Sequence, residues 1–589
     1  MEARDVLSQS PLFEGIDRDA IDALAAHATL IDVRSGARVC ARGSAPDQVY
    51  IVAAGRLRAT LADGRIAGTI PRFAPSGEIS AVLGEPRSAD VYAIRDSVLV
   101  ELPSAALLRT MERFPAAMLR LMRIVAQRLR QNAGTQALAA VQRRSTLAVL
   151  PARPGVPARR VAEQLCRHLD GAARLIDVQT IGAALGIEPH EWARAPADPQ
   201  RTRQLTEYLN ELEIRNAQLV YLAESRADDW ALRCIAQADC VLVVADAGDL
   251  RPGGPMVELL QGSGSRAPVD VLLLRPDGAP SPVTLEWRAS CGAGAHHYLR
   301  PDRDADYARL ARQLSGRGIG LVLGGGGARG FAHIGLLRAL QELDIPVDVA
   351  GGSSMGAFLA ALLACGRSVD DIRLIARDTF VAHNYLNDYV LPTISLIRGR
   401  KFTRHLHEIF GEQSIETLRL PYFCVTTNLT RGAAVMHDRG PLYLWTATSM
   451  AVPGVAPPLA YNGELYADGA VANSLPTDLM QRLERGPIIA SDVSTEGGVA
   501  APGVAGPDPE GVFRLRGADA PRLLSILFRT ATLTSESGVA QRAARADVYL
   551  RMPVSRIGMF DWKRMDEIVE RGYQHAMQQL QGQRELLLR

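Results

Sequence analysis

The sequence predicts a multidomain α/β protein with three parts: an N-terminal β-roll followed by a long helix, a middle parallel α/β domain, and a larger C-terminal α/β domain. Three observations predict this class. The chain has 589 residues, more than one hydrophobic core usually fills. Hydrophobic residues make up 47% and charged residues 22%, as in ordinary folded proteins. The hydrophobic pattern changes along the chain from evenly spaced short strands to alternating strands and helices.

Composition excludes several classes of function. The net charge of +2 supplies no basic field for coating nucleic acid. Lysines occur only at Lys401 and Lys563, neither in a glycine-rich loop, which disfavours lysine chemistry. The 7 cysteines form no C-x-x-C pair. We therefore expect no metal site and a reducing, cytoplasmic location.

The sequence shows no membrane anchor. The N-terminus carries acidic residues and no apolar signal-peptide core. Apolar runs such as 358–365 are far shorter than the ~20 residues that span a bilayer. Any contact with lipid is therefore expected to be peripheral, on the inner face of the membrane.

The elements follow in order. Residues 1–105 read as short strands separated by turns, and apolar residues at three- and four-residue steps from Pro115 predict a long helix towards Arg144. This helix either mediates a homodimer or packs on the roll. Buried strands are then predicted in the alternating pattern of a parallel sheet, at 146–150, 174–178, 218–223, 240–245 and 269–274. We expect domains at 1–145, 146–312 and 313–589.

Two motifs near the start of the C-terminal part indicate nucleophilic catalysis. Residues 352–356 read Gly-Ser-Ser-Met-Gly between an apolar strand and a helix, the context of a nucleophile elbow with Ser354 as nucleophile. Upstream, residues 324–330 read Gly-Gly-Gly-Gly-Ala-Arg-Gly at another strand-to-helix junction, where backbone N–H groups can stabilise an oxyanion. A dinucleotide fingerprint is the competing interpretation. It needs an acidic residue at the end of the second strand, where this chain has Gly351 and Gly352.

The catalytic base is less obvious, because no downstream histidine has a distinguishing pattern. Residues 466–470, Tyr-Ala-Asp-Gly-Ala, instead offer an aspartate at the end of a short strand. The glycine loop, the elbow and this Asp-Gly-Ala motif, in order over residues 318–477, resemble the patatin-like phospholipase family. The resemblance implies an α/β hydrolase domain in which serine and aspartate act as a dyad.

Carried over residue by residue, the resemblance implies that Ser354 is the nucleophile and Asp468 the general base. It also implies an oxyanion loop made of Gly325, Gly326, Gly327, Arg329 and Gly330. An aspartate of ordinary pKa near ~3.9 is a weak base, so the dyad requires a desolvated pocket.

Two other residues near the motifs have a structural interpretation. His333 is expected to pack or cap within its helix, and Asp492 to cap a loop, although it remains open as a second base. An inactive remnant is the remaining alternative for the constellation, but no motif position is missing.

The N-terminal part carries a second resemblance. Residues 77–91, GEISAVLGEPRSADV, are similar to the phosphate-binding cassette of cyclic nucleotide-binding domains. Arg87 can pair with a cyclic phosphate, and Ser88 can donate to it. Helix-start amides near Ile79 and Ser80 can add support, and Glu78 would accept from a ribose hydroxyl. With Gly77 these residues form the expected nucleotide site, for cAMP or cGMP as regulator. The alternative is an Arg87 that only pairs with Glu78 or Glu85.

A nucleotide-gated transcription regulator is the rival class. Such a protein would carry a helix-turn-helix soon after the long helix and end there, whereas this chain continues. The middle part lacks a Gly-Lys-Ser/Thr phosphate loop at 151–157, and its stretch 236–244 resembles bacterial relatives of neuropathy target esterase. The sequence therefore predicts a serine esterase of the lysophospholipase or phospholipase A type that requires no cofactor. The alternative is a catalytically silent, nucleotide-responsive scaffold.

Overall fold

The structure is a computed structural model that resolves two compact units, Met1–Ala311 and Arg312–Arg589. It describes residues 2–588 except 63–65, 115–117, 120–121, 124–144, 170–172, 187–204, 206–207, 210, 214, 225, 277–279, 384, 392, 484, 495–502, 505, 509 and 516–522. The predicted multidomain α/β class is confirmed, because the chain forms antiparallel sheets first, then a parallel sheet, then a mixed sheet.

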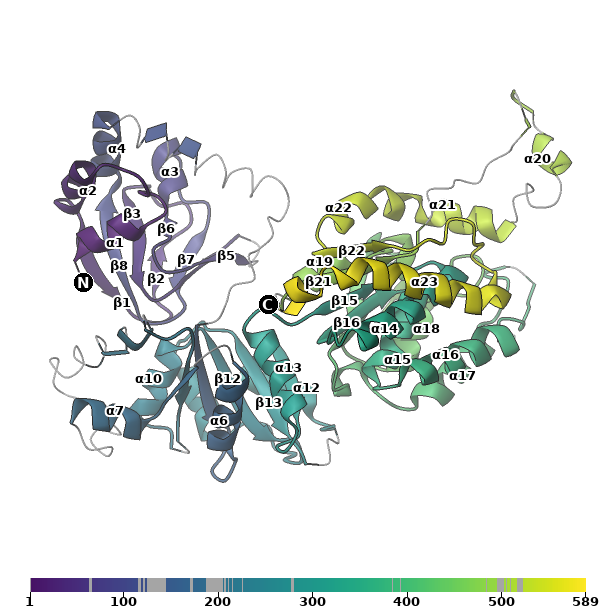
Figure 1. Ribbon diagram of the computed structural model, residues 1–589, viewed down its shortest axis with the longest axis horizontal. Coiled ribbons are helices and arrows are strands. Elements are labelled where there is room, and N and C mark those ends of the chain that lie inside the picture. Colours follow the sequence, from purple (N-terminus) through teal and green to yellow (C-terminus); the bar gives the residue numbers. More distant parts are fainter. Residues whose placement is uncertain are drawn as a thin grey trace. The chain divides into compact units, whose positions relative to one another are not determined.

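A β-roll opens the first unit (Figure 1, purple). Its two antiparallel sheets have the orders β1-β8-β3-β6 and β2-β7-β4-β5. The strands are β1 (Thr29–Val33), β2 (Arg38–Cys40), β3 (Gln48–Ala54), β4 (Leu57–Thr60), β5 (Ile66–Ile70), β6 (Pro75–Ser76), β7 (Asp90–Ala93) and β8 (Ser97–Pro103). Apolar side chains of β3 and β8 form the core with four short helices: α1 (Ala3–Gln9), α2 (Arg18–Ala25), α3 (Glu78–Leu83) and α4 (Ser104–Arg113).

The long helix predicted from Pro115 lies mostly outside the described residues. The described residues 118–119 and 122–123 within this stretch are helical. The helices α1, α2 and α4 were not predicted, because helices of seven to ten residues carry too few turns to show a clear period.

A parallel six-stranded sheet in the order β10-β11-β9-β12-β13-β14 completes the first unit. Its strands are β9 (Thr146–Pro151), β10 (Arg174–Ile176), β11 (Leu219–Leu222), β12 (Cys240–Asp246), β13 (Val269–Leu274) and β14 (Ala295–Leu299). The described helices are α6 (Ala158–His168), α7 (Val178–Leu185), α10 (Asp229–Gln237), α11 (Pro255–Gly262), α12 (Thr284–Cys291) and α13 (Asp304–Leu314), which runs into the second unit. All five predicted strands are confirmed. Strand β14 was missed because its histidines interrupt the apolar run.

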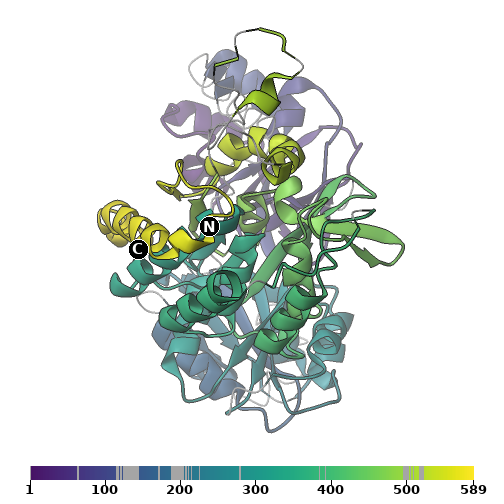
Figure 2. The ribbon, with the colours of Figure 1, turned by 90° about the vertical axis from the view of Figure 1, so that its right-hand side faces the viewer.

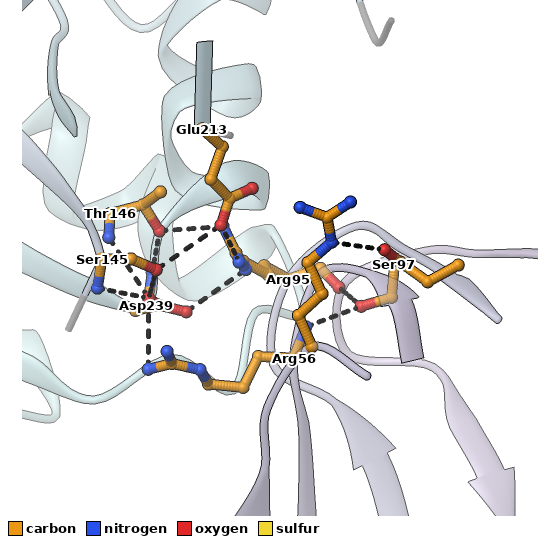
Figure 3. A network of polar contacts seen from close by, with 9 residues as sticks. Arg56, Arg95, Ser97, Ser145, Thr146, Glu213 and Asp239 are labelled. Atoms are coloured by element: carbon orange, nitrogen blue, oxygen red, sulfur yellow. Dashed lines mark hydrogen bonds and ion pairs between the residues drawn. The ribbon is translucent and has the colours of Figure 1, made fainter. Parts of the chain in front are cut away.

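A buried ion network joins the β-roll to this parallel sheet (Figure 3). Arg95, in the turn between β7 and β8, lies 3.2 Å from Asp239 and also pairs with Glu213. Arg56 contacts the other oxygen of Asp239 at 3.2 Å. Burial alone would raise the pKa of Asp239, but Arg95 and Arg56 outweigh it and the pKa is lowered. Asp239 is therefore a buried carboxylate that depends on two arginines from the roll.

Arg95→Ala is expected to lower the free energy of unfolding of the first unit by about 3–5 kcal/mol, because it removes one of the two arginines that compensate the buried charge of Asp239. Urea denaturation followed by circular dichroism measures the loss. Arg233→Ala is the matched control, since Arg233 pairs with Asp96 at 3.4 Å in the same region but both side chains are partly exposed. It should cost less than about 1 kcal/mol. Equal effects of the two substitutions would contradict the burial argument.

The second unit is built on a mixed sheet in the order β19-β20-β17-β16-β15-β21-β22, with β18 also paired to β17. The strands are β15 (Gly320–Leu323), β16 (Val349–Ser353), β17 (Tyr422–Asn428), β18 (Ala433–His437), β19 (Leu459–Tyr461), β20 (Glu464–Asp468), β21 (Ile488–Asp492) and β22 (Val548–Arg551). Strands β17, β16, β15, β21 and β22 run parallel, whereas β18 and β20 pair with β17 antiparallel. The carboxyl ends of the central strands β15 and β16 therefore lie together, where loops build a site.

Helices surround the sheet of the second unit. They are α14 (Ala332–Glu342), α15 (Met355–Ala364), α16 (Val369–Arg377), α17 (Arg400–Phe410), α18 (Leu442–Ser449), α19 (Thr477–Gln481), α20 (Gly511–Arg514), α21 (Leu523–Ser537), α22 (Val539–Ala543), α23 (Met565–Gln581) and α24 (Arg584–Leu588). Shorter turns are η1 (Gly327–Phe331), η2 (Asp378–Ala382), η3 (Ile415–Thr417), η4 (Gly469–Val471) and η6 (Trp562–Arg564).

The helix α23, near the C-terminus, packs closely against α14 (Figure 1 and Figure 2, yellow against teal). Glycines permit the close approach: a Cβ on Gly335 would lie 2.2 Å from the Val569 carbonyl oxygen, and a Cβ on Gly572 would lie 2.3 Å from that of Ala332. Because α14 follows the glycine loop directly, α23 supports the backbone at which that loop ends. None of the described helices is long and apolar enough to cross a membrane.

Candidate active site

Ser354 lies at the sharp turn between β16 and α15. Its φ of 52° is in the left-handed region, which costs energy for a residue with a side chain. The flanking glycines are required sterically, since a Cβ on Gly352 would lie 2.6 Å from the backbone of Gly356 and one on Gly356 would lie 2.0 Å from the Leu323 carbonyl oxygen. The turn thus presents the Ser354 hydroxyl away from the sheet.

Asp468 ends β20 and faces Ser354 across the sheet. The Ser354 Oγ donates a hydrogen bond of 2.8 Å to Asp468 Oδ2, and the Ala470 amide donates one of 2.8 Å to Oδ1. The carboxyl group is fully buried. Burial raises the pKa of Asp468 from 3.8 to about 7, although the hydrogen bonds from Ala470 and Ser354 act in the opposite direction. A carboxylate of this basicity can accept the serine proton near neutral pH.

Ser449, at the end of α18, holds the turn in place. Its Oγ accepts a 3.0 Å hydrogen bond from the Ser354 amide and donates one of 2.6 Å to the Val425 carbonyl oxygen. The strained backbone at Ser354 is therefore bound to β17, the strand that also pairs with β20. Ser449 was not predicted from the sequence, because no motif surrounds it.

The glycine loop lies directly against Ser354. A Cβ on Gly325 would lie 3.2 Å from that of Ser354, closer than ordinary van der Waals contact, so the loop leaves little room for a side chain there. The Gly325 amide donates to the Ser474 carbonyl oxygen at 3.0 Å. Within the described part of the chain, the amides of Gly326 and Gly327 donate to no group. These two amides are available to an oxyanion, whereas the Gly325 amide is occupied.

Arg329 and Gly330 shape this loop. The buried Arg329 Nε donates to the Gly326 carbonyl oxygen at 3.2 Å. Because a trans peptide directs its C=O and N–H oppositely, this bond turns the Gly327 N–H away from Arg329. Burial lowers the pKa of Arg329 to about 10, which still leaves it charged at neutral pH. A Cβ on Gly330 would lie 2.4 Å from Met355, so glycine is needed where the loop meets the start of α15.

His333 and Asp492 have structural contacts. His333 is fully buried, with Nε2 2.9 Å from the Gly324 carbonyl oxygen and Nδ1 2.8 Å from Ser491 Oγ. Burial lowers its pKa to about 4, so it is neutral. Asp492 accepts hydrogen bonds from Ser494 and from the Tyr549 hydroxyl. Neither side chain bonds to Ser354.

A cavity of 660 Å³ opens onto Ser354. Its walls are mostly apolar and come from α17, α18, the segment 450–459 and residues 559–562. Three arginines, Arg398, Arg400 and Arg404, are both exposed and part of the lining, so they lie at its mouth. Sequence reasoning missed these walls, because they come from separate segments that share no motif.

The cassette residues of the β-roll also come together. Gly77 has a φ of 91° and precedes α3, on which Glu78, Ile79 and Ser80 lie. The Arg87 guanidinium is buried and donates to the Gly77 carbonyl oxygen at 2.9 Å and to that of Gln48. Ser88 is exposed. Arg87 therefore contacts one backbone carbonyl group of the cassette and one at the start of β3, where the sequence left open a pairing with Glu78 or Glu85.

The first loop of the parallel sheet, between β9 and α6, stands where a phosphate loop would lie. Arg153 in this loop pairs with Asp249 at 3.0 Å, and a Cβ on Gly254 would lie 2.3 Å from the Ala152 carbonyl oxygen.

Across the described residues, no group of three or more His, Cys, Asp or Glu side chains could hold a metal ion.

Three family models match this chain. Residues 30–114 match the cyclic nucleotide-binding domain, residues 143–300 the neuropathy target esterase family P-loop-like domain, and residues 321–480 the patatin-like phospholipase family. These matches confirm the resemblances drawn from the motifs, in the same order along the chain.

Similar proteins are found in animals and fungi. Patatin-like phospholipase domain-containing protein 7 of Rattus norvegicus is 32% identical over 93% of this chain and 45% of its own length. Patatin-like phospholipase domain-containing protein 6 of Homo sapiens is 31% identical over 92% of this chain and 44% of its own length. Lysophospholipase nte1 of Aspergillus fumigatus is 27% identical over 94% and 42%. The chain thus spans less than half the length of these relatives.

Proposed function

From the match of residues 321–480 to the patatin-like phospholipase family, we propose that the chain hydrolyses acyl esters of lysophospholipids or phospholipids, with Ser354 as nucleophile and Asp468 as base. The observation that carries the proposal is the 2.8 Å hydrogen bond from Ser354 Oγ to a fully buried Asp468, whose pKa is about 7, beside an apolar cavity.

The chemistry proceeds in two steps. Ser354 Oγ attacks the ester carbonyl carbon while its proton passes to Asp468, and Asp468 then protonates the departing alcohol oxygen. Water attacks the resulting acyl-enzyme, gives its proton to Asp468, and the fatty acid leaves as the proton returns to Ser354. Each step passes through a tetrahedral oxyanion, which the amides of Gly326 and Gly327 would bind.

The cavity supports a lipid acyl chain as the bound group. Its walls include Phe380, Phe402 and Leu444, which offer apolar contact to a hydrocarbon chain. The raised pKa of Asp468 has a separate cause, the full burial of its side chain, because a desolvated carboxylate binds its proton more tightly.

Release of fatty acid from lysophosphatidylcholine and from diacyl phosphatidylcholine, each with the same acyl chain, tests the proposal. We expect fatty acid from at least one of these lipids, together with covalent labelling by a fluorophosphonate, which reacts with activated serines. Absence of both hydrolysis and labelling would support the catalytically silent scaffold instead.

Regulation by a cyclic nucleotide is the second part of the proposal. The support is the match of residues 30–114 to the cyclic nucleotide-binding domain and the position of Arg87 over the cassette. A Cβ on Gly77 would lie 1.9 Å from Arg87, so only glycine allows the guanidinium to lie there. A cyclic phosphate would replace the carbonyl contacts of Arg87 with charge-assisted hydrogen bonds.

Arg87→Ala is expected to weaken binding of cAMP or cGMP by about 1–3 kcal/mol, the range for a hydrogen bond to a charged group. Isothermal calorimetry on the full chain measures this, with Ser88→Ala as the milder comparison. A wild-type chain that gives no heat with either nucleotide would reject the ligand but leave the esterase proposal intact.

We also propose the domain boundaries 1–145, 146–312 and 313–589. The boundary after residue 312 falls between the second and third family matches, which end at 300 and begin at 321, whereas the boundary after residue 145 lies just inside the second match, which begins at 143. The chemistry above uses only amide, hydroxyl and carboxyl groups of the chain, so we propose no cofactor beyond the regulatory nucleotide. We place the site of action at a membrane surface.

A further inference from the structure

The segment between η2 and α17 forms a short projecting arm, here called the entrance arm and defined as the described residues 388–391 and 393–398. Tyr389 and Ile397 form an antiparallel bridge, the Val390 amide donates to the Leu396 carbonyl oxygen at 3.1 Å, and the Arg398 amide donates to that of Asp388 at 3.0 Å. The two sides of the arm therefore pair like a small hairpin.

The base of the arm is fixed to the body of the unit. The amides of Leu396 and Ile397 donate to the carbonyl oxygens of Gly454 and Val455, both at 3.0 Å. Ile397 is 2% exposed and lines the cavity. The arm thus forms part of the cavity wall at its base.

The outer part of the arm exposes large apolar side chains. Leu391 is 81% exposed, and Tyr389 and Ile394 are each 73% exposed. None of these three lines the cavity. Water is an unfavourable environment for such side chains, and apolar side chains gathered on one segment mark an interaction site.

Basic side chains lie beside this apolar tip. Arg398, Arg400, Lys401 and Arg404 are all exposed, and within the described chain none forms an ion pair. Lys401 Nζ donates to the Asn387 side-chain oxygen. The nearby carboxylate of Asp388 accepts from the backbone amides of Gly399 and Lys401. The surface therefore carries unpaired positive charge.

We propose that the entrance arm and the basic residues that follow it dock onto an anionic phospholipid bilayer, with the apolar tip inserted among the lipids. The exposed apolar residues match the apolar interior of such a bilayer, and the basic residues beside them match its negative phosphates. An acidic protein partner would match the charge but would need an apolar groove of its own for the tip, whereas every phospholipid bilayer has an apolar interior.

The position of the arm explains what docking achieves. Arg398, Arg400 and Arg404 lie at the mouth of the cavity that contains Ser354. With the tip in the bilayer, this mouth faces the lipid headgroups, and an acyl chain enters the cavity without crossing water. This consequence rests on the proposed esterase function, whereas the docking itself does not.

Vesicle sedimentation with full-length Ser354→Ala protein tests the docking, because this variant consumes no lipid. We compare vesicles of phosphatidylcholine alone with an equimolar mixture of phosphatidylcholine and phosphatidylglycerol. We expect binding to the mixed vesicles that weakens with salt. The Ser354→Ala protein is the parent, and adding both Leu391→Ser and Ile394→Ser to it gives the tip variant. The tip variant should bind the mixed vesicles at least about tenfold more weakly than the parent, since two large apolar side chains lose their burial. Adding Lys401→Gln and Arg404→Gln to the parent should weaken binding by a similar factor.

Leu586→Ser is the matched control for the tip. Leu586 is 67% exposed on α24, and the Arg584 side chain donates to the Leu343 carbonyl oxygen at the far end of α14. Because α14 begins beside the glycine loop, α24 lies at the opposite end of the unit from the cavity. This control should bind vesicles like its parent.

Three outcomes would overturn the proposal. The first is a parent protein that binds neither vesicle. The second is a tip variant that binds as tightly as its parent. The third is a parent that dimerises in gel filtration and a tip variant that does not, which would make the arm a self-association surface. The two tip substitutions are also made in protein that retains Ser354. This protein should hydrolyse a soluble short-chain ester as fast as the wild type, which separates failed docking from failed catalysis.

Discussion

Ser354→Ala is expected to reduce ester hydrolysis by about 10⁴-fold or more, because it removes the atom that forms the acyl-enzyme. Fatty acid release from lysophosphatidylcholine by the purified variant measures the loss, and covalent labelling by a fluorophosphonate should disappear with it. The fold should remain, because the substitution removes none of the backbone contacts of the turn. The amide at position 354 still donates to Ser449.

Ser353→Ala is the matched control, one residue away with the same chemical change. Ser353 is fully buried, and its hydroxyl has no hydrogen-bond partner among the described residues. Its removal should leave turnover unchanged. Retained turnover in Ser354→Ala, or equal losses in the two variants, would contradict the assignment of Ser354.

Asp468→Asn is expected to abolish hydrolysis to a similar degree, because an amide cannot accept the serine proton. The wild-type pH profile gives an independent test of the base. Since the pKa of Asp468 is about 7, kcat/KM should rise with pH, bend near pH 7 and stay level above it as the carboxylate becomes ionised. A flat profile between about pH 5 and about pH 8 would contradict the role of Asp468 as base.

The same substitution is expected to stabilise the protein at high pH. The folded-state pKa lies above the ordinary value of 3.8, so folded protein binds more protons than unfolded protein between those two pH values. Wild-type stability therefore falls as pH rises from about 4 to about 7, and the cost of the buried charge is complete above pH 7. Asp468→Asn carries no such cost, so its advantage in Tm should be larger at about pH 8 than at about pH 5. Calorimetry measures both values. An advantage that does not grow with pH would contradict the raised pKa.

The fold class and the central motifs could be predicted from the sequence because both depend on local patterns. A turn that places Ser354 at positive φ between two close backbones requires glycine on both sides, and those glycines are visible in the sequence. The parallel strands of the first unit are buried on both faces, so they appear as continuous apolar runs.

Contacts between distant residues could not be predicted in this way. Arg95 meets Asp239 and Glu213 through the tertiary fold, and single charged residues carry no periodic signal. Ser449 and the cavity walls are similar cases. The hydrogen bond from the Gly325 amide, within the expected oxyanion loop, to the Ser474 carbonyl oxygen is another such contact, because it depends on a segment about 150 residues later.

The contact between the glycine loop and residue 559 bears on how the protein is made. The Ala328 amide donates to the Met559 carbonyl oxygen at 2.8 Å, and Trp562 stacks on Phe380 in the cavity wall. The ribosome adds these residues more than 200 positions after Ser354. A nascent chain therefore carries its serine and its aspartate long before the oxyanion loop and the lipid cavity are complete. The proposed hydrolase activity should thus appear only late in synthesis, after residue 562 has been added.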